Sequence, residues 1–344
     1  MQINRVARAL LAASVAAAAV ALGACDRFGH ADHVRSAPDA LAFVIPRPAT
    51  DTDLTKTADV ADRWRPLLAD MQAETGLKVE PLFEAPGQAA VEALESGRAQ
   101  AGLFTEAAGL EAVRRADGEV FAGAVSAAAP QGRAAVLVVR AKSPLTLDQV
   151  LRCGRRLSYG SGDARSVAAT LAPAAYLFAP RGLAPAACFR TVRAGDPAGN
   201  LAAVASGGLD AAASDTPSLN ALAAARPEAA RELRVIWTSP TLPAEPLVWR
   251  KDLDPSVKEK LRAFLMEYGQ APGAEGERQR QVLAGVGLGR FRPAGDELLL
   301  PLQEMDASQA LMKARDIRDP AAVRRAEAEL TRVRRAQAAA ARAG

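Results

Sequence analysis

The chain has 344 residues and a formal net charge of +4 at pH 7, so it is long enough for two lobes that each bury a core. Residues 1–24 hold two arginines and no acidic residue. Without them the net charge falls from +4 to +2, which excludes the basic surface of a nucleic-acid-binding protein. Both histidines, His30 and His33, lie near the N-terminus. The folded lobes therefore have no His for a Ser-His-Asp or Cys-His catalytic arrangement.

The N-terminal segment has the pattern of an export signal. Two arginines precede an apolar run at residues 9–22, which is too short to span a membrane comfortably. The segment LGAC (22–25) resembles the bacterial lipobox, which implies cleavage of residues 1–24 and lipid attachment at Cys25. The alternative is an ordinary secretory signal followed by an incidental cysteine. Residues 25–40 are polar and are predicted to form a flexible tether.

Residues 41–104 alternate between short apolar runs and amphipathic segments. The predicted order is strand, helix, strand, helix and strand, over residues 41–45, 60–75, 77–83, 88–96 and 99–104. Gly76 and Gly97 follow the two helices and are predicted to end them. This order is typical of half of a doubly wound α/β sheet.

The segment from Leu157 to Asp215 repeats the same alternation. A short strand that contains Tyr159 enters a Gly/Ser loop, and a helix is predicted to start at Ser166. A second strand and loop lead to a helix at about Asn200, and a third strand runs up to Asp215. The alternation predicts a parallel sheet with its loops at one edge, where helix N-termini present free N–H groups to a ligand.

Two sequence segments resemble the family of periplasmic binding proteins for phosphate, phosphite and phosphonate. The segment DARSVAATLAP (163–173) keeps the Asp, the first Ser and the Pro of the family's D-P-x-S-T-S-G-x-x-x-P motif. The segment IWTSPTLPAEPLVWRKDL (236–253) closely resembles the family's W-T-S-P-x-I-P-x-x-P-L-V-x-R motif. The resemblance implies a substrate-binding protein of an ABC transporter.

The resemblance also implies a fold, the type 2 periplasmic binding fold of the α/β class. Each of its two lobes is expected to be a mostly parallel sheet flanked by helices, and two hinge strands join the lobes. The hinge strands are expected within residues 134–151 and 246–265. The expected parts are a first lobe at residues 41–142 and 239–300, a second lobe at residues 143–238, and a C-terminal helical extension at residues 301–344.

Arg165, Ser166 and Asp215 are candidate ligand-binding residues. At a helix start, the Ser166 hydroxyl and several N–H groups can converge on an oxyanion, and Arg165 adds a guanidinium. The resemblance implies that Asp215 accepts a hydrogen bond from a protonated or amino group of a ligand. Structural alternatives remain, because Ser166 can be a plain N-cap and Asp215 a helix cap ahead of Pro217.

The chain departs from the family where ligand-binding hydroxyl and aromatic groups are expected. The Thr and Ser that follow the first Ser of the family motif are replaced by Val167 and Ala168. A family loop that supplies a Tyr aligns with TEAAG (105–109), and a family aromatic residue aligns near Arg133. The predicted ligand-binding set therefore combines arginines with few hydroxyls and consists of Arg47, Thr105, Arg133, Arg165, Ser166 and Asp215. The hypothesis is a different anionic ligand, or a weakly binding relative with a sensory or scaffolding role.

Cys153 and Cys188 each stand just before a predicted strand. Those strands are expected to be neighbours in one parallel sheet, which can bring the two Cα atoms within bridging distance. Because an exported protein resides in an oxidising compartment, a disulfide between them is predicted. The alternative is a pair of buried thiols.

The C-terminal region turns polar and rich in arginine. Asp319 and Pro320 form an N-cap and first-turn pair, and apolar residues then recur at steps of three and four up to Val333. This pattern predicts a short amphipathic helix. It either packs on the protein or is solvated, or it faces a partner or a membrane with its arginines outward.

The leading hypothesis is a monomeric solute-binding protein that closes on a small phosphonate- or phosphate-like anion and delivers it to an ABC permease. It would lie at the periplasmic or extracytoplasmic face of a bacterial membrane, held there by the lipid on Cys25. The alternative is a sensing or scaffolding protein that docks on a membrane receptor. An enzyme would need an ionisable cluster in the cleft, where only Asp215, Glu106 and arginines are found. No metal-binding spacing or nucleotide-binding motif occurs, so no metal or cofactor is expected.

Overall fold

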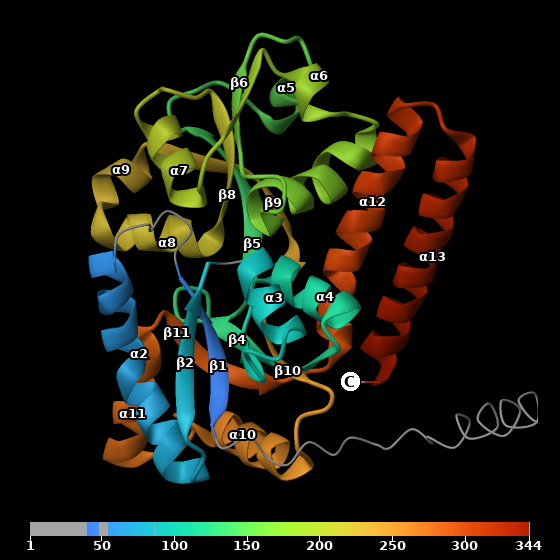
Figure 1. Ribbon diagram of the computed structural model, residues 1–344. Helices are drawn as coiled ribbons and strands as arrows, with labels where there is room; N and C mark the ends of the chain where they lie inside the picture. Colours follow the sequence, from blue (N-terminus) through green and yellow to red (C-terminus); the bar gives the residue numbers. More distant parts are fainter. Residues whose placement is uncertain (1–39, 48–53, 86, 344) are drawn as a thin grey trace, which may run out of the picture. The chain divides into compact units, whose positions relative to one another are not determined.

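The computed structural model describes residues 40–47, 54–85 and 87–343 (Figure 1). The signal sequence, Cys25 and nearly all of the expected tether lie outside these residues. The described chain forms two β-sheets, each flanked by helices, and a pair of C-terminal helices. The α/β class and the two-lobed architecture are therefore confirmed.

The first sheet has the strand order β11-β4-β10-β3-β1-β2. Its strands are β1 (Leu41–Pro46), β2 (Val79–Glu84), β3 (Ala101–Leu103), β4 (Gly118–Ser126), β10 (Glu245–Arg250) and β11 (Leu288–Pro293). Its helices are α2 (Leu54–Thr75), α3 (Gln88–Glu95), α4 (Glu106–Arg115), α10 (Pro255–Glu267) and α11 (Gly273–Gly285). These elements form the first lobe.

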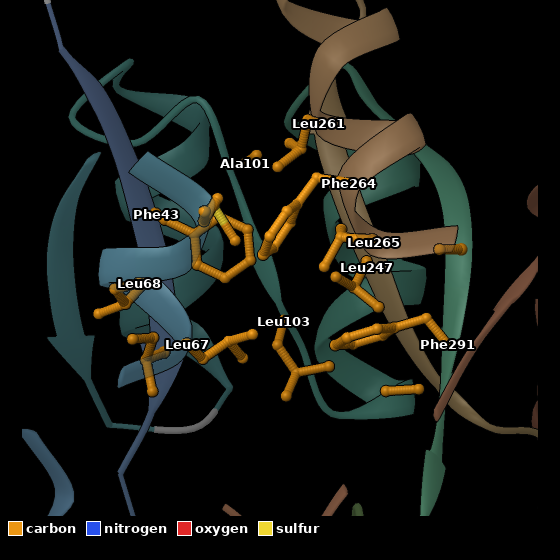
Figure 2. Close-up of a cluster of buried hydrophobic side chains, with 14 of the residues drawn as sticks. Phe43, Leu67, Leu68, Ala101, Leu103, Leu247, Leu261, Phe264, Leu265 and Phe291 are labelled. Atoms are coloured by element: carbon orange, nitrogen blue, oxygen red, sulfur yellow. The ribbon is translucent and has the colours of Figure 1, made fainter. Parts of the chain in front are cut away.

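Both faces of the first sheet are buried, which explains the nearly continuous apolar sequence of β1. Phe43 faces a core that includes side chains of α2 and α10 (Figure 2). Val44 belongs to the opposite core. Successive strand residues point to opposite faces of the sheet. Alternate side chains of β1 therefore pack into the two cores in turn. Figure 2 shows the first of these cores, where Leu67 of α2 and Phe264 of α10 belong to the same cluster.

The second sheet has the order β7-β6-β8-β5-β9. Its strands are β5 (Arg133–Arg140), β6 (Ser158–Ser161), β7 (Thr191–Ala194), β8 (Ala211–Asp215) and β9 (Leu233–Leu242). Its helical segments are α5 (Leu147–Val150), η1 (Val167–Leu171), η2 (Pro173–Phe178), η3 (Ala179–Arg181), α6 (Pro185–Cys188), α7 (Pro197–Ala205), α8 (Thr216–Ala225) and α9 (Pro227–Arg231). These elements form the second lobe.

Both sheets are mixed, whereas mostly parallel sheets were expected. β1 is parallel to β2 and β3, and β6 is parallel to β7 and β8. The remaining pairings are antiparallel, and they involve the strands on either side of the chain crossings. The physical reason is that the chain leaves the first sheet along β4 and returns along β10, so these two neighbours run in opposite directions.

The chain crosses between the two sheets at residues 127–132 and 243–244. The segments expected to be hinge strands begin close to these crossings. Gly132 has a φ of +114°, a conformation that favours glycine. A Cβ atom there would lie 2.7 Å from Cγ2 of Thr241, so glycine also allows the first crossing to approach the end of β9.

The C-terminal chain forms η4 (Asp296–Leu299), α12 (Leu300–Asp316) and α13 (Pro320–Ala343). The backbone N–H groups of Ala321 and Ala322 donate to the Asp319 carboxylate at 2.9 and 3.0 Å, as expected for its predicted N-cap role. α13 lies against α12, with Ala326 and Val333 buried (Figure 1). The structure therefore favours the packed helix over the solvated one.

The predicted disulfide between Cys153 and Cys188 is present. It joins the loop before β6 to the end of α6, just ahead of β7. Because β6 and β7 are parallel neighbours, residues that precede them lie at the same edge of the second sheet.

Candidate functional site

A cavity of about 680 Å³ lies at the two chain crossings. Its lining comes from the first sheet, the second sheet and the C-terminal segment. The charged residues of the lining are Arg133, Asp215, Glu245, Arg292 and Glu297. Cavities of this volume commonly hold small molecules. A ligand in this one would touch both lobes.

Arg133 is the first residue of β5 and forms ion pairs in two directions. Its Nη2 atom contacts the Oε1 atom of Glu106 in the first lobe. Its Nη1 atom lies 3.9 Å from the Oδ2 atom of Asp215 at the end of β8. Glu106 is 4% exposed and Asp215 is 6% exposed, so one guanidinium joins two buried carboxylates from different lobes.

Glu245 adds a third carboxylate to this group. It begins β10, directly after the second crossing. Burial, together with the charges of Glu106 and Asp215, raises the pKa of Glu245 from an ordinary 4.5 to about 7, although Arg133 acts to lower it. Burial also acts to lower the pKa of Arg133, but the three carboxylates outweigh it and the pKa is raised.

These charges give the cavity an acidic centre around a single guanidinium. Three carboxylates surround Arg133, and two of them, Asp215 and Glu245, line the cavity. The remaining charged lining residues, Arg292 and Glu297, have opposite signs. In a buried site such charges interact more strongly than they do in water. An anionic group that enters is therefore repelled unless Arg133 becomes available to it, whereas a protonated amine is attracted.

The structure brings two of the six predicted ligand-binding residues together in the cavity, Arg133 and Asp215. The second oxygen of Asp215 accepts a hydrogen bond from the Ser218 backbone N–H at 2.8 Å. Asp215 therefore caps α8 and faces Arg133 at the same time. The two alternatives for this residue are compatible with each other.

Arg165 and Ser166 lie outside the cavity lining. The Ser166 hydroxyl accepts from the Ala169 backbone N–H at 3.3 Å, which is the plain N-cap arrangement. Arg165 donates from Nη2 to the Ala107 carbonyl oxygen at 3.2 Å, and thereby links the second lobe to the first. Both residues thus have structural partners in this conformation.

Thr105 and Arg47 do not line the cavity themselves. The Thr105 hydroxyl caps α4 by accepting from the Ala108 backbone N–H at 3.4 Å, and it precedes Glu106. Arg47 follows Pro46, which lines the cavity, and its backbone N–H donates to the Glu84 carbonyl oxygen at 2.9 Å.

Val167 and Ala168 are packed in a core that both lobes share. They are 5% and 3% exposed and belong to one apolar cluster with Phe104 of the first lobe. Apolar packing therefore replaces the two hydroxyl groups that the resemblance places there. The start of η1 therefore packs in a core that it shares with the first lobe in this conformation.

Glu245 is the cavity residue that the sequence pattern does not reveal. It stands between Ala244 and Pro246 in a segment that otherwise reads as an apolar strand. An acidic residue at the start of a buried strand is the one signal that could have identified it. Glu106 can be found in the sequence as an ionisable residue, but its pairing with Arg133 cannot.

The described part of the chain contains neither a metal-binding cluster nor a membrane-spanning helix. Within residues 40–47, 54–85 and 87–343, no group of three or more His, Cys, Asp or Glu side chains has a metal-binding arrangement. Over the same residues, no helix combines the length and apolar character that a membrane span requires.

Comparison with known proteins agrees with this architecture. A sequence profile of the family described as "ABC transporter, phosphonate, periplasmic substrate-binding protein" matches residues 55–299. The chain is 34% identical over 244 residues to the phosphonates-binding periplasmic protein of Escherichia coli (strain K12), covering 71% of this chain and 70% of that protein.

Solved structures of other proteins have a similar fold. The binding protein component of an ABC phosphonate transporter from Pseudomonas aeruginosa is similar, with a TM-score of 0.70, 29% identity, and coverage of 88% of this chain and 99% of that one. A Prochlorococcus marinus (MIT 9301) protein, solved in complex with methylphosphonate, shares the fold with a TM-score of 0.61 and 16% identity, over 82% of this chain and 99% of that one.

Proposed function

Because the chain belongs to the family of periplasmic substrate-binding proteins of phosphonate ABC transporters, we propose that it binds a small phosphonate- or phosphate-like anion in the cavity between its lobes. It then delivers this ligand, as a monomer, to an ABC permease. The observation that carries the proposal is the position of Arg133 in a cavity lined by both lobes. A ligand held there contacts both lobes, so binding and closure are coupled.

The charges of the cavity narrow the class of ligand. Arg133 can pair with an oxyanion, while Asp215 and Glu245 can accept hydrogen bonds from a protonated amine. A ligand with both groups would match the cavity better than a simple anion. We therefore propose a phosphonate that also has an amino group as the preferred candidate.

The segment LGAC (22–25) supports attachment of the protein to a membrane through a lipid on Cys25. The tether of residues 25–40 would then hold the lobes at the periplasmic face of a bacterial membrane, within reach of the permease. Metabolic labelling with palmitate tests this attachment. Label is expected in the wild-type chain and not in Cys25→Ala, and equal labelling of the two would rule it out.

A second candidate function follows from the paired state of Arg133. Because Glu106 contacts its guanidinium and Val167 and Ala168 are packed, the cavity offers fewer free donors than a dedicated anion site needs. A sensing or scaffolding protein that docks on a membrane receptor would tolerate such weak ligand binding. The finding that no ligand stabilises the protein against unfolding would favour this second function.

Thermal unfolding of the full chain against a ligand panel tests the main proposal. The panel contains methylphosphonate, an aminoalkylphosphonate, phosphate, phosphite, an alkanesulfonate and a neutral amino acid. A ligand that binds only the folded state at a hundredfold excess over its Kd adds about 2.7 kcal/mol of stability. The aminoalkylphosphonate is expected to give the largest shift.

Two variants on the same strand show whether the shift comes from the cavity. Arg133→Ala is expected to abolish it, whereas Arg140→Ala, at the exposed end of β5, is expected to leave it unchanged. Stabilisation by the sulfonate or the amino acid alone would exclude the phosphonate-like ligand but keep the binding function. A flat response across the panel would exclude these ligands and favour the sensor or scaffold.

A further inference from the structure

We propose that Glu106 acts as an internal competitor for Arg133 and thereby lowers the affinity of the protein for anionic ligands. Its carboxylate contacts Nη2 of the guanidinium across the two lobes, and an anionic ligand gains this donor only by displacing the carboxylate. The part of this inference that concerns ligands rests on the proposed function. The part that concerns the contact between lobes does not.

Local structure holds the Glu106 carboxylate in place. Glu106 is the first residue of α4, directly after the N-cap Thr105. A carboxylate is favoured in the first turn of a helix, where it faces the positive end of the helix dipole. Since the side chain is 4% exposed, water does not offer it an alternative set of partners. Its partner is the guanidinium of the opposite lobe.

Arg133 is fixed just as firmly on its own side. It starts β5, and its backbone is in register with Leu242 at the end of β9. The ion pair therefore joins the N-terminus of a first-lobe helix to a strand of the second lobe. Separating the lobes would break it.

The Glu106 carboxylate and the oxyanion of a ligand bind a guanidinium through the same chemistry. A carboxylate and an oxyanion such as a phosphonate bind the same N–H groups of a guanidinium in the same in-plane geometry. Nη2 of Arg133 contacts Glu106, while Nη1 lies 3.9 Å from Asp215, beyond hydrogen-bond distance. An oxyanion that approaches Nη2 of Arg133 thus meets a donor that already has a partner.

The contacts around the pair would hold the lobes together in the absence of ligand. Arg165 donates to the Ala107 carbonyl oxygen, one residue after Glu106, and Val167 packs in the shared apolar core. A ligand then selects between two closed forms, one bridged by Glu106 and the other bridged by the ligand. Its apparent affinity is reduced by the fraction of the protein in which Glu106 occupies Arg133.

Glu106→Gln tests the competition, because it keeps the size of the side chain and removes its charge. The matched control is Glu111→Gln, which lies five residues further along α4 and removes a carboxylate that pairs with Arg114 of the same helix. Binding of methylphosphonate and of inorganic phosphate to the full chain is measured by titration calorimetry. We expect Glu106→Gln to bind both anions about tenfold more tightly than the wild type, a change of about 1.4 kcal/mol. Glu111→Gln should match the wild type.

Small-angle X-ray scattering of the ligand-free variants gives a measurement that does not depend on any ligand. We expect a larger radius of gyration for Glu106→Gln than for the wild type and Glu111→Gln, because the bridge between the lobes is weakened. Should Glu106→Gln fail to fold, Glu106→Asp serves in its place. It keeps the charge but shortens the side chain by one methylene. We therefore expect smaller increases in anion affinity and in radius of gyration.

The outcomes separate this inference from the proposed function. If the wild type binds methylphosphonate and Glu106→Gln binds it no more tightly, the competitor role is overturned and the binding function stands. If no variant binds either anion, the proposed anion-binding function fails, and scattering then decides the inference. An unchanged radius of gyration in Glu106→Gln overturns it, and an increase supports Glu106 as the bridge between the lobes.

Discussion

Glu245 is the residue through which pH is expected to act on the fold. Burial beside two other carboxylates raises its pKa from 4.5 to about 7. Between these two pH values the folded protein holds a proton that the unfolded chain releases. The contribution of Glu245 to stability is therefore fully present below about pH 4.5 and is lost as the pH rises through about 7.

Replacing Glu245 with Gln tests this sign. In the wild type, this residue alone would remove up to about 3 kcal/mol of stability between pH 4.5 and 8. The melting temperature of Glu245→Gln is expected to fall less over that range than that of the wild type. Glu232→Gln is the control and should keep the wild-type profile, because it changes a partly exposed carboxylate elsewhere in the chain. Parallel profiles for Glu245→Gln and the wild type would contradict the raised pKa.

At the scale of single elements, the disulfide secures the edge of the second sheet where β6 and β7 begin. Cys153 and Cys188 are separated by 35 residues, and those residues include η1, η2 and α6. A cross-link over a loop of this length stabilises a protein by about 3–4 kcal/mol when chain entropy dominates.

Reduction of this bond is expected to lower the free energy of unfolding by that amount. Urea unfolding with and without a reducing agent measures the difference. The double variant Cys153→Ala/Cys188→Ala should show the same loss and no further response to the reductant. A reductant effect that persists in this variant would show that the loss comes from elsewhere in the chain.

α12 is the second element whose role can be tested directly. Leu302 on this helix is 1% exposed and belongs to the apolar cluster that includes residues of both lobes. Leu302→Ala is expected to cost about 2–5 kcal/mol of stability, since it removes buried methyl groups and leaves a cavity.

The matched control for this change lies one residue beyond the end of the same helix. Ile317 is 62% exposed, so Ile317→Ala is expected to change stability by no more than about 0.5 kcal/mol. Equal effects of Leu302→Ala and Ile317→Ala in urea unfolding would show that α12 is not an integral part of the fold.

At the scale of the whole molecule, one apolar cluster connects the two lobes. It contains Val44 of the first sheet, Ala135 of the second sheet and Met305 of α12. If one lobe unfolded alone, the apolar side chains of the other lobe in this cluster would become exposed to water. The two lobes are therefore expected to unfold together.

Scanning calorimetry measures this cooperativity. A single transition is expected, with a calorimetric enthalpy equal to the van't Hoff enthalpy. Two resolved transitions, or a calorimetric enthalpy well above the van't Hoff value, would show that the lobes are independent. In that case the shared cluster would contribute little to stability.

Local patterns in the sequence determined the elements and their order. The apolar run at residues 41–45 predicts β1, and Asp319 before Pro320 predicts the start of α13. The alternation of strand and helix predicts the α/β class. These features depend on neighbours within a few residues of each other, so one sequence is enough to identify them.

The contacts between charged residues of the cavity follow from the packing of the two sheets and not from local sequence. Glu106 and Arg133 are 27 residues apart and lie in different lobes, and Glu245 reaches the same cavity from the second crossing. No local spacing encodes such contacts, because they depend on how the two sheets pack and on which strands run back antiparallel. The same packing buries Val167 and Ala168, and it leaves a single guanidinium among three carboxylates. The class of the fold was thus available from the sequence, whereas the electrostatics of the cavity arose from burial and proximity in three dimensions.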